Sequence, residues 1–329
     1  MKSSKHPDSR PSALVRPTRR KFLTTSLKTT ALLGFPTIIP SSALGKDGAV
    51  APSERLTLGC IGTGGKGRHN LDVFMKHPEV EVAALCDPAG NHLAEATGMV
   101  HRKTGKKDVK GYADFRQLLA AHSCDIVCVS TPDHGHALTT IAALEAGADV
   151  YCEKPLANSV GEGRAMAATA KRTGKIVQTG SHERSNANAR FAAELVRSGR
   201  IGALQEVRIQ LPADQGHHKK ARAFEGIPAA EPVPENFDYD LWLGHTPMKP
   251  YNARRCHFWW RFILAYGGGE MTDRGAHVID LAQLGMGTDD TGPVHIEARG
   301  VQTAGSLYDA YWDYDFVNTY AGGLKMTGV

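Results

Sequence analysis

Between residues 55 and 179, short apolar runs alternate with helical patterns, and this alternation leaves few folds open. The runs that we predict as strands are residues 55–61, 80–86, 109–112, 125–130, 149–153 and 176–179. The stretches that we predict as helices are residues 67–77, 91–104, 114–121, 134–146 and 159–173. Continuous apolar strands interleaved with helices are typical of a parallel sheet that is covered on both faces. We therefore predict an α/β fold with a doubly wound parallel sheet.

The pattern changes near residue 181, where a second domain is expected to begin. A long irregular segment, residues 212–257, carries six prolines, and loops of that length inside a compact domain are usually functional. The predicted helices here are residues 186–197 and 273–284, and the predicted strands are residues 205–211, 294–301 and 311–321. They indicate an α+β domain with a mainly antiparallel open sheet.

The chain length supports this division into two domains. At about 150 residues per domain, 329 residues suggest two, and we place them at residues 54–180 and 181–329. Residues 322–329 have the pattern of a hairpin turn whose return strand has just begun. A chain that stops there leaves a sheet edge unpaired, so we expect the sequence to be a fragment with an incomplete second domain.

The positive charge is concentrated in the first 43 residues. They carry eight Lys and Arg against one acid, Asp8, a balance of +7, so the total of +5 leaves −2 for residues 44–329. A nearly neutral body lacks the clustered basic face that nucleic-acid binding requires. No run of about 18 apolar residues occurs, so we expect no transmembrane span.

The basic leader resembles a twin-arginine signal peptide over residues 1–43. Thr-Arg-Arg-Lys-Phe-Leu at residues 18–23 precedes an apolar stretch at 31–39 and small residues at 41–43. Such signals carry folded proteins across a bacterial inner membrane, so the resemblance implies the twin-arginine translocase as a partner and a periplasmic or otherwise exported protein. The alternative is a basic tail that carries no address.

A glycine-rich turn follows the first predicted strand. Residues 62–67, Gly-Thr-Gly-Gly-Lys-Gly, match G-x-G-x-x-G, and Asp87 follows twenty residues after Gly67. In a Rossmann domain Gly62 would permit the tight turn, Gly64 would let the backbone approach a pyrophosphate, and Gly67 would let helix and strand pack. Asp87 would accept from a ribose hydroxyl and repel a 2′-phosphate, which favours NAD; NADP is the alternative. A glycine-rich turn of purely structural use is the other interpretation.

Two further motifs stand at the carboxyl ends of predicted strands, where open parallel sheets bind ligands. They are Thr-Pro-Asp-His-Gly-His at residues 131–136 and Glu-Lys-Pro at 153–155. With residues 180–184 and the block 267–277, they resemble the glucose–fructose oxidoreductase/inositol dehydrogenase (Gfo/Idh/MocA) family over residues 55–329. Motif and resemblance together predict the cofactor-binding residues Gly62, Thr63, Gly64, Gly65, Lys66, Gly67, Asp87, Thr131, Pro132, His136, Glu153 and Lys154.

The resemblance also implies a catalytic group of Lys154, Asp273 and His277. Oxidation of a secondary alcohol releases a proton as the hydride leaves, and a histidine that titrates near neutrality suits that proton transfer. Asp273 and His277 are four residues apart, so on one helix they would share a face. The alternative is that Asp273 caps the helix and His277 fills space. We predict no metal, because the histidines lack ligand spacing.

Substrate contacts are predicted from the second domain. All four tryptophans follow residue 240, and flat aromatic faces suit sugar rings, although core packing explains them equally well. Trp259 and Arg261 lead into the predicted catalytic helix, and Arg184 belongs to the 180–184 motif. We take these three as substrate-binding candidates.

The sequence thus predicts an NAD(P)-dependent oxidoreductase that transfers a hydride between a secondary hydroxyl of a sugar, cyclitol or derivative and a tightly bound nicotinamide cofactor. We expect it to self-associate through its open sheet. One alternative is a redox-neutral, NAD-recycling glycosidase or epimerase that acts through a transient keto-sugar; relatives of that type tend to lack the motif lysine, so Lys154 favours the dehydrogenase. A further alternative is a dinucleotide-binding protein without catalysis.

Overall fold

The first sheet has six strands in the order β3-β2-β1-β4-β5-β6, and every pair of neighbours is parallel. The computed structural model describes residues 50–211 and 216–329. The strands are β1 (Leu56–Ile61), β2 (Val80–Cys86), β3 (Lys110–Tyr112), β4 (Ile126–Val129), β5 (Asp149–Cys152) and β6 (Val177–Thr179). The helices are α2 (Gly65–Phe74), α3 (Gly90–Thr104), α4 (Phe115–Ala121), α5 (Asp133–Glu145) and α6 (Val160–Thr173). The predicted doubly wound parallel sheet is confirmed.

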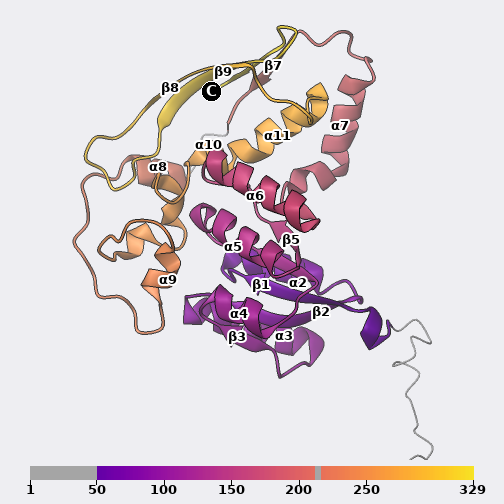
Figure 1. Ribbon diagram of the computed structural model, residues 1–329. Helices are drawn as coiled ribbons and strands as arrows, with labels where there is room; N and C mark the ends of the chain where they lie inside the picture. The colour runs from indigo at the N-terminus through magenta and orange to yellow at the C-terminus, as the bar shows by residue number, and fades with distance from the viewer. Residues whose placement is uncertain (1–49, 212–215) are drawn as a thin grey trace, which may run out of the picture. The chain divides into compact units, whose positions relative to one another are not determined.

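Apolar side chains of this sheet pack into two cores, one on each face. Leu58 of β1 and Leu71 of α2 belong to one core, while Val127 of β4 and Leu118 of α4 belong to the other, and all four are fully buried. Truncation of such a leucine to alanine costs about 2–5 kcal/mol of stability. Burial on both faces explains why the central strands read as uninterrupted apolar runs. Figure 1 shows α5 and α6 lying side by side.

The second sheet has four strands in the order β7-β10-β9-β8. They are β7 (Glu206–Ile209), β8 (His295–Val301), β9 (Trp312–Thr319) and β10 (Lys325–Gly328). β9 pairs antiparallel with β8 and β10, whereas β7 pairs parallel with β10, so the sheet is mainly antiparallel as predicted. The expectation of an unpaired edge at the return strand is wrong, because β10 has a partner on each side.

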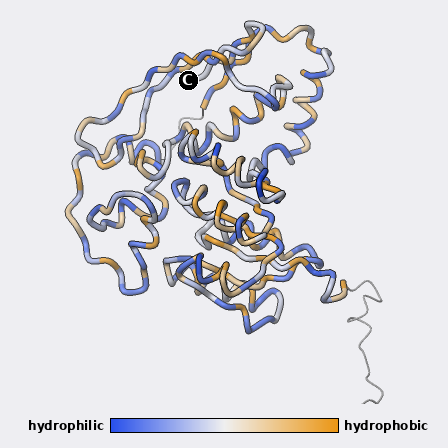
Figure 2. The backbone as a smooth tube through the Cα atoms, in the orientation of Figure 1, coloured by the Kyte–Doolittle hydropathy of each residue, from blue (hydrophilic) through white to orange (hydrophobic). Residues whose placement is uncertain are grey.

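Helices of the second domain cover this sheet and hold its core. α7 (Ala187–Arg197) packs against α11 (Gly275–Met286), and α11 in turn contacts β7. These helices carry both polar and apolar residues along their length (Figure 2). None of the helices within the described part of the chain is long and apolar enough to cross a bilayer.

In its described part, the long segment predicted as irregular contains the α-helices α8 (His217–Arg222) and α9 (Tyr239–Leu243) and the 3₁₀ helix η4 (Ala253–Arg255). Buried aromatic side chains anchor it to the second domain. Trp242 of α9 lies against Tyr239 and Tyr266, with 5.2 Å between the ring centroids of Trp242 and Tyr266. The aromatic packing, rather than a periodic apolar pattern, fixes this segment, so the sequence pattern did not indicate its helices.

Candidate active site

The loop between β1 and α2 requires glycine at two positions. Gly62 has a φ of 86°, and a Cβ there would lie 2.5 Å from the carbonyl of Ser130. A Cβ on Gly67 would lie 2.0 Å from the carbonyl oxygen of Gly62. No side chain caps the first turn of α2, so its backbone N–H groups are available to an anion. This geometry fits the pyrophosphate of a dinucleotide.

Asp87 holds this loop against the end of β2. Its Oδ2 accepts a hydrogen bond from the Thr63 backbone N–H at 2.7 Å, and its Oδ1 accepts from the Ala89 N–H at 2.9 Å. The carboxylate also lines the cavity described below. Asp87 therefore shapes the loop in addition to the ribose contact predicted for it.

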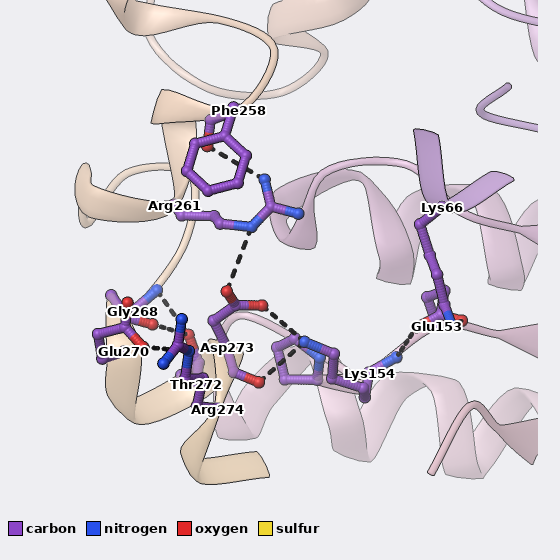
Figure 3. A network of polar contacts seen from close by, with 12 residues as sticks. Lys66, Glu153, Lys154, Phe258, Arg261, Gly268, Glu270, Thr272, Asp273 and Arg274 are labelled. Carbon is purple, nitrogen blue, oxygen red and sulfur yellow. Dashed lines mark hydrogen bonds and ion pairs between the residues drawn. The ribbon is translucent and has the colours of Figure 1, made fainter. Parts of the chain in front are cut away.

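Glu153 is buried at the end of β5, behind the glycine loop. Its Oε1 accepts from Asn70 Nδ2 at 2.9 Å. The same oxygen lies 3.5 Å from Lys66 Nζ (Figure 3). Its Oε2 accepts from the Lys154 backbone N–H at 3.2 Å. The carboxylate thus ties the glycine loop to the strand end that presents Lys154. Sequence reasoning missed Asn70, which belongs to no recognised motif.

Lys154 reaches from the first domain to Asp273 in the second. Its Nζ lies 2.7 Å from Asp273 Oδ1 and donates to the Asp273 carbonyl oxygen at 2.8 Å (Figure 3). On the other side, Arg261 Nε lies 3.5 Å from Asp273 Oδ2. Burial raises the pKa of Asp273, but Lys154 and Arg261 outweigh that effect and hold the pKa below its usual value. Asp273 is therefore ionised at neutral pH.

The helix predicted at residues 273–284 is broken at its start. The short helix α10 (Glu270–Asp273) ends where the prediction began, and α11 begins at Gly275. The prediction that Asp273 and His277 share one continuous helix is therefore wrong. The two residues nevertheless remain close, because Arg274 keeps a helical backbone between them and His277 N–H donates to its carbonyl.

His277 presents a neutral imidazole. Burial, the charge of Lys154 and nearby His182 lower its pKa from the ordinary histidine value, against the opposing effect of Glu183 and Asp273. Its Nδ1 is buried without a hydrogen-bond partner. The ring of His182 lies edge-on to it, with 4.6 Å between centroids. An imidazole that is neutral at pH 7 can accept a proton.

One cavity of about 590 Å³ joins these groups. Its walls come from both domains, and most of the predicted site residues belong to them: Gly62, Gly64, Gly65, Lys66, Asp87, Thr131, Pro132, His136, Glu153, Lys154, Arg261, Asp273 and His277. Thr63 and Gly67 lie behind the wall, where they shape the loop. The cavity runs from the glycine cradle to Lys154 and His277, so the residues present fit a dinucleotide with its reactive end at the second domain.

Arg184 and Trp259, two of the predicted substrate contacts, are not part of this wall. Arg184 lies 2.7 Å from both Asp280 Oδ2 and Asp289 Oδ1. Trp259 stacks on Tyr308, with 5.9 Å between centroids. Its neighbours Phe258 and Trp260 line the cavity instead. The substrate-binding roles of Arg184 and Trp259 remain predictions that the lining of this cavity does not support.

His136 fixes two motifs to each other. Its Nδ1 lies 2.7 Å from the Pro155 carbonyl oxygen and its Nε2 lies 3.0 Å from that of Thr131. Burial lowers the pKa of His136. The side chain therefore binds the two strand ends that face the cavity.

Sequence reasoning missed several residues of the wall, among them Asp133, His182 and His257. Asp133 is buried, and burial raises its pKa well above the usual value against the effect of Lys154 and Arg261. Asp133 belongs to the motif at residues 131–136, and this membership could have identified it from the sequence. His257 belongs to no recognised motif.

Across residues 50–211 and 216–329, no cluster of three or more His, Cys, Asp or Glu is arranged to hold a metal.

Known proteins resemble this chain in both domains. A profile described as "Oxidoreductase family, NAD-binding Rossmann fold" matches residues 56–181, and one described as "Oxidoreductase family, C-terminal alpha/beta domain" matches residues 185–327. The chain is 30% identical over 153 residues to D-glucoside 3-dehydrogenase of Escherichia coli, a match covering 46% of this chain and 42% of that protein. It is 32% identical over 169 residues to alpha-N-acetylgalactosaminidase of Shewanella oneidensis, covering 50% and 37%. The matches therefore span less than half of these relatives.

Solved structures share the fold. An oxidoreductase domain protein from Kribbella flavida superposes with a TM-score of 0.59 at 26% identity, covering 83% of this chain and 66% of that one. The WlbA dehydrogenase from Bordetella pertussis, solved with NADH and UDP-GlcNAcA, gives 0.60 at 18% identity, covering 83% and 71%. With both family profiles matched in order, the chain belongs to the Gfo/Idh/MocA oxidoreductase family and contains its NAD-binding Rossmann domain followed by its C-terminal α/β domain.

Proposed function

We propose that this protein oxidises a secondary hydroxyl of a sugar, cyclitol or sugar derivative and uses a tightly bound NAD as hydride acceptor. The observation that carries the proposal is the contact of 2.7 Å between Lys154 Nζ and Asp273 Oδ1 in a cavity continuous with the glycine cradle. Lysine and carboxylate come from different domains, so the reacting group would lie between the two.

His277 is the proton acceptor in this proposal. Because its pKa is lowered, the imidazole is neutral at pH 7 and can take the proton from the substrate hydroxyl. When bound, NAD supplies the acceptor for the hydride that leaves the same carbon. The proton and the hydride thus leave the alcohol by separate routes, and the carbinol becomes a carbonyl.

Lys154 would hold the substrate oxygen. An ammonium group has three N–H donors, and two of them point to the Asp273 carboxylate and carbonyl. The third can donate to the oxygen that gains negative charge as the proton leaves, which is where electrostatic stabilisation lowers the barrier. Asp273 positions Lys154 through these two contacts. Arg261 lines the same wall and remains a candidate substrate contact.

The relative named D-glucoside 3-dehydrogenase supports a sugar as substrate. The test is a screen of sugars and cyclitols with purified protein and NAD, followed at the absorbance band of the reduced nicotinamide. Lys154→Ala should lower turnover on any active substrate by about 10²–10⁴-fold, as removal of a positioned catalytic group does. The exposed Lys107→Ala is the matched control. Equal turnover in Lys154→Ala and Lys107→Ala would refute the proposal.

A redox-neutral glycosidase or epimerase is the second candidate, since a relative of 32% identity is named alpha-N-acetylgalactosaminidase. Such an enzyme would oxidise a sugar carbon, use the acidified neighbouring proton, and reduce the carbon again. Release of an aglycone from a chromogenic glycoside without net reduction of NAD would select this candidate. Unchanged turnover in both Lys154→Ala and His277→Ala would refute the catalytic role of these two residues. Binding of NAD with no turnover of any sugar, cyclitol or glycoside tested would instead select a protein that binds dinucleotide without catalysis.

We further propose that residues 1–43 export the folded protein by the twin-arginine pathway; they lie outside the described residues. In this proposal NAD is loaded before transport, because the destination holds no free nicotinamide pool. The reduced cofactor is reoxidised in place by a second half-reaction, in which it returns the hydride to a second carbonyl substrate. A reporter fused to residues 1–43 should reach the periplasm, and Arg19→Lys together with Arg20→Lys should retain it in the cytoplasm.

Self-association through the open sheet of the second domain is proposed as well. Light scattering of the purified protein measures its oligomeric state.

A further inference from the structure

A segment of the second domain, residues 234–238, is bonded to the nucleotide-binding domain beside Asp87. Gly90 N–H donates to the Asn236 carbonyl oxygen at 2.7 Å, and Asp238 N–H donates to that of Pro88 at 2.9 Å. Ala89 and Phe237 form an antiparallel bridge between these bonds. The connection that follows β2 is thus paired with a segment from the long loop of the other domain. We call residues 234–238 the bridging segment.

His257, at the end of the same long loop, faces this corner of the cavity. Its ring lies 5.4 Å from that of Phe237 in the bridging segment and 5.3 Å from that of His92 in α3. His92 Nδ1 in turn lies 3.7 Å from Asp87 Oδ1. All three of Asp87, His92 and His257 line the cavity. Two imidazoles, one from each domain, therefore contact each other at this corner, and the His92 ring also approaches the Asp87 carboxylate.

The backbone of His257 is held in an unfavourable conformation. Its φ is 54°, in the left-handed region that a non-glycine residue adopts only when its surroundings require it. Such residues gather at binding sites. Glycine would adopt this backbone conformation with less strain. The imidazole at this position is therefore kept at a cost in backbone conformational energy.

The orientation of a dinucleotide in a Rossmann domain shows which part of the cofactor would lie beside Asp87, His92 and His257. In a Rossmann domain the pyrophosphate lies at the amino end of the first helix, here α2, and the adenosine ribose lies at the carboxyl end of the second strand, here β2. Asp87 ends that strand, and Thr63 and Ala89 already bond to its carboxylate. A ribose placed there would lie in the same cavity as His257 of the second domain.

We propose that His257 is a cofactor-binding residue contributed by the second domain, which hydrogen-bonds the adenosine ribose of the dinucleotide while the bridging segment holds it in place. The ADP-ribose half of the cofactor is then enclosed by both domains rather than by the Rossmann domain alone. This inference rests on the NAD-binding part of the proposed function and not on the substrate, so a failed sugar screen leaves it unaffected.

The test is the binding of ADP-ribose, measured by calorimetry on the full chain freed of nucleotide. His257→Gly removes the imidazole and suits the positive φ, so it should fold as well as the wild type and bind ADP-ribose roughly ten-fold more weakly, about the loss expected for one hydrogen bond. Asp313→Gly is the matched control: Asp313 is a second non-glycine residue with positive φ in the described part of the chain, at 44°, and it does not line the cavity. Its affinity for ADP-ribose should equal that of the wild type.

Wild-type affinity in His257→Gly overturns the proposal. So does an equal loss in Asp313→Gly, which would trace the effect to backbone strain. His257→Asn is the second variant, since asparagine tolerates this backbone and its shorter side chain should weaken ADP-ribose binding about three-fold. If His257→Gly melts below the wild type, the affinity of His257→Asn decides: a loss supports the assignment, and wild-type affinity refutes it.

Discussion

Lys154 and Asp273 stand 119 residues apart in the chain, yet the Nζ of one lies 2.7 Å from the Oδ1 of the other. The pair is partly buried, where a charge-assisted contact is stronger than at the surface. It joins the strand end that carries the Glu-Lys-Pro motif to the last residue of α10. The two domains therefore meet at the group on which the proposed chemistry depends.

Asp273→Asn tests the role of the carboxylate. Asparagine keeps the shape but removes the charge that faces Lys154 and Arg261, so we expect kcat to fall by about 10–10³-fold while ADP-ribose affinity stays unchanged. Steady-state kinetics and calorimetry measure the two effects. Asp289→Asn, which removes a contact of Arg184 outside the cavity, serves as the control. A variant with normal kcat would show that the charge of Asp273 is dispensable.

The pH profile tests His277. A neutral imidazole accepts the proton, and the lowered pKa keeps it neutral to lower pH than an ordinary histidine. We therefore expect kcat/KM to rise with pH, with the midpoint below the ordinary histidine pKa of about 6.5, and to level off above it. His277→Asn should lower kcat/KM and abolish this limb. An identical limb in His277→Asn would assign the titration to another group.

Gly67→Ala tests the dinucleotide cradle. A methyl group there would meet the Gly62 carbonyl oxygen at 2.0 Å, so the loop must move. Overpacking of this kind costs about 1–3 kcal/mol, and we expect a lower melting temperature and at least roughly ten-fold weaker binding of NAD. Gly161→Ala in α6 is the control, because its new methyl group meets only Ser159 Oγ at 3.9 Å. Normal NAD affinity in Gly67→Ala would contradict this account of the loop.

Acid stability tests His134, a buried histidine of α5. Burial lowers its pKa from 6.5 to about 4, so the folded protein keeps the ring neutral while the unfolded chain binds a proton below pH 6.5. The contribution of the neutral His134 ring to the free energy of unfolding is therefore complete above pH 6.5 and is lost as pH falls toward 4. At ~1.36 kcal/mol per pKa unit, the loss is on the order of 3 kcal/mol. Urea unfolding at pH 7 and pH 4.5 measures it.

His134→Gln removes this titration while its amide can still donate to the Trp242 carbonyl, which His134 Nε2 contacts at 3.0 Å. The loss of stability between pH 7 and 4.5 should therefore be smaller in His134→Gln. The exposed His295→Gln should keep the wild-type loss. If all three proteins lose the same free energy of unfolding, another group controls the acid transition.

The sequence predicted the first domain well because its signals are local. Each strand is an apolar run and the loop before α2 is a glycine motif, so neighbouring residues suffice to identify both. The group of Lys154, Asp273 and His277 was predicted by resemblance, and the structure brings these residues to one cavity. The break at Arg274 was missed, because no proline and no unfavourable run marks it.

Features that depend on distant backbone atoms could not be predicted. The bridging segment is held by backbone carbonyl groups, which every residue has, and by backbone N–H groups, which only proline lacks. The side chain of Asn236 therefore gives no sign of the bond between its carbonyl and Gly90. Trp259 and Trp260 are adjacent in a 3₁₀ turn, and only the turn's orientation decides which ring reaches the cavity. The acidic partners of Arg184, Asp280 and Asp289, lie about a hundred residues later in the chain, so no local pattern indicates these contacts.

The parallel pairing of β7 with β10 has a consequence for synthesis on the ribosome. β7 ends at Ile209, and the strand that bonds to it begins only at Lys325. The six strands of the first sheet, by contrast, have all been made once Thr179 has emerged. The nascent chain must therefore carry β7 without its β10 partner for most of the second domain's translation, and during that period the charged Glu206 and Arg208 oppose pairing of β7 with other chains.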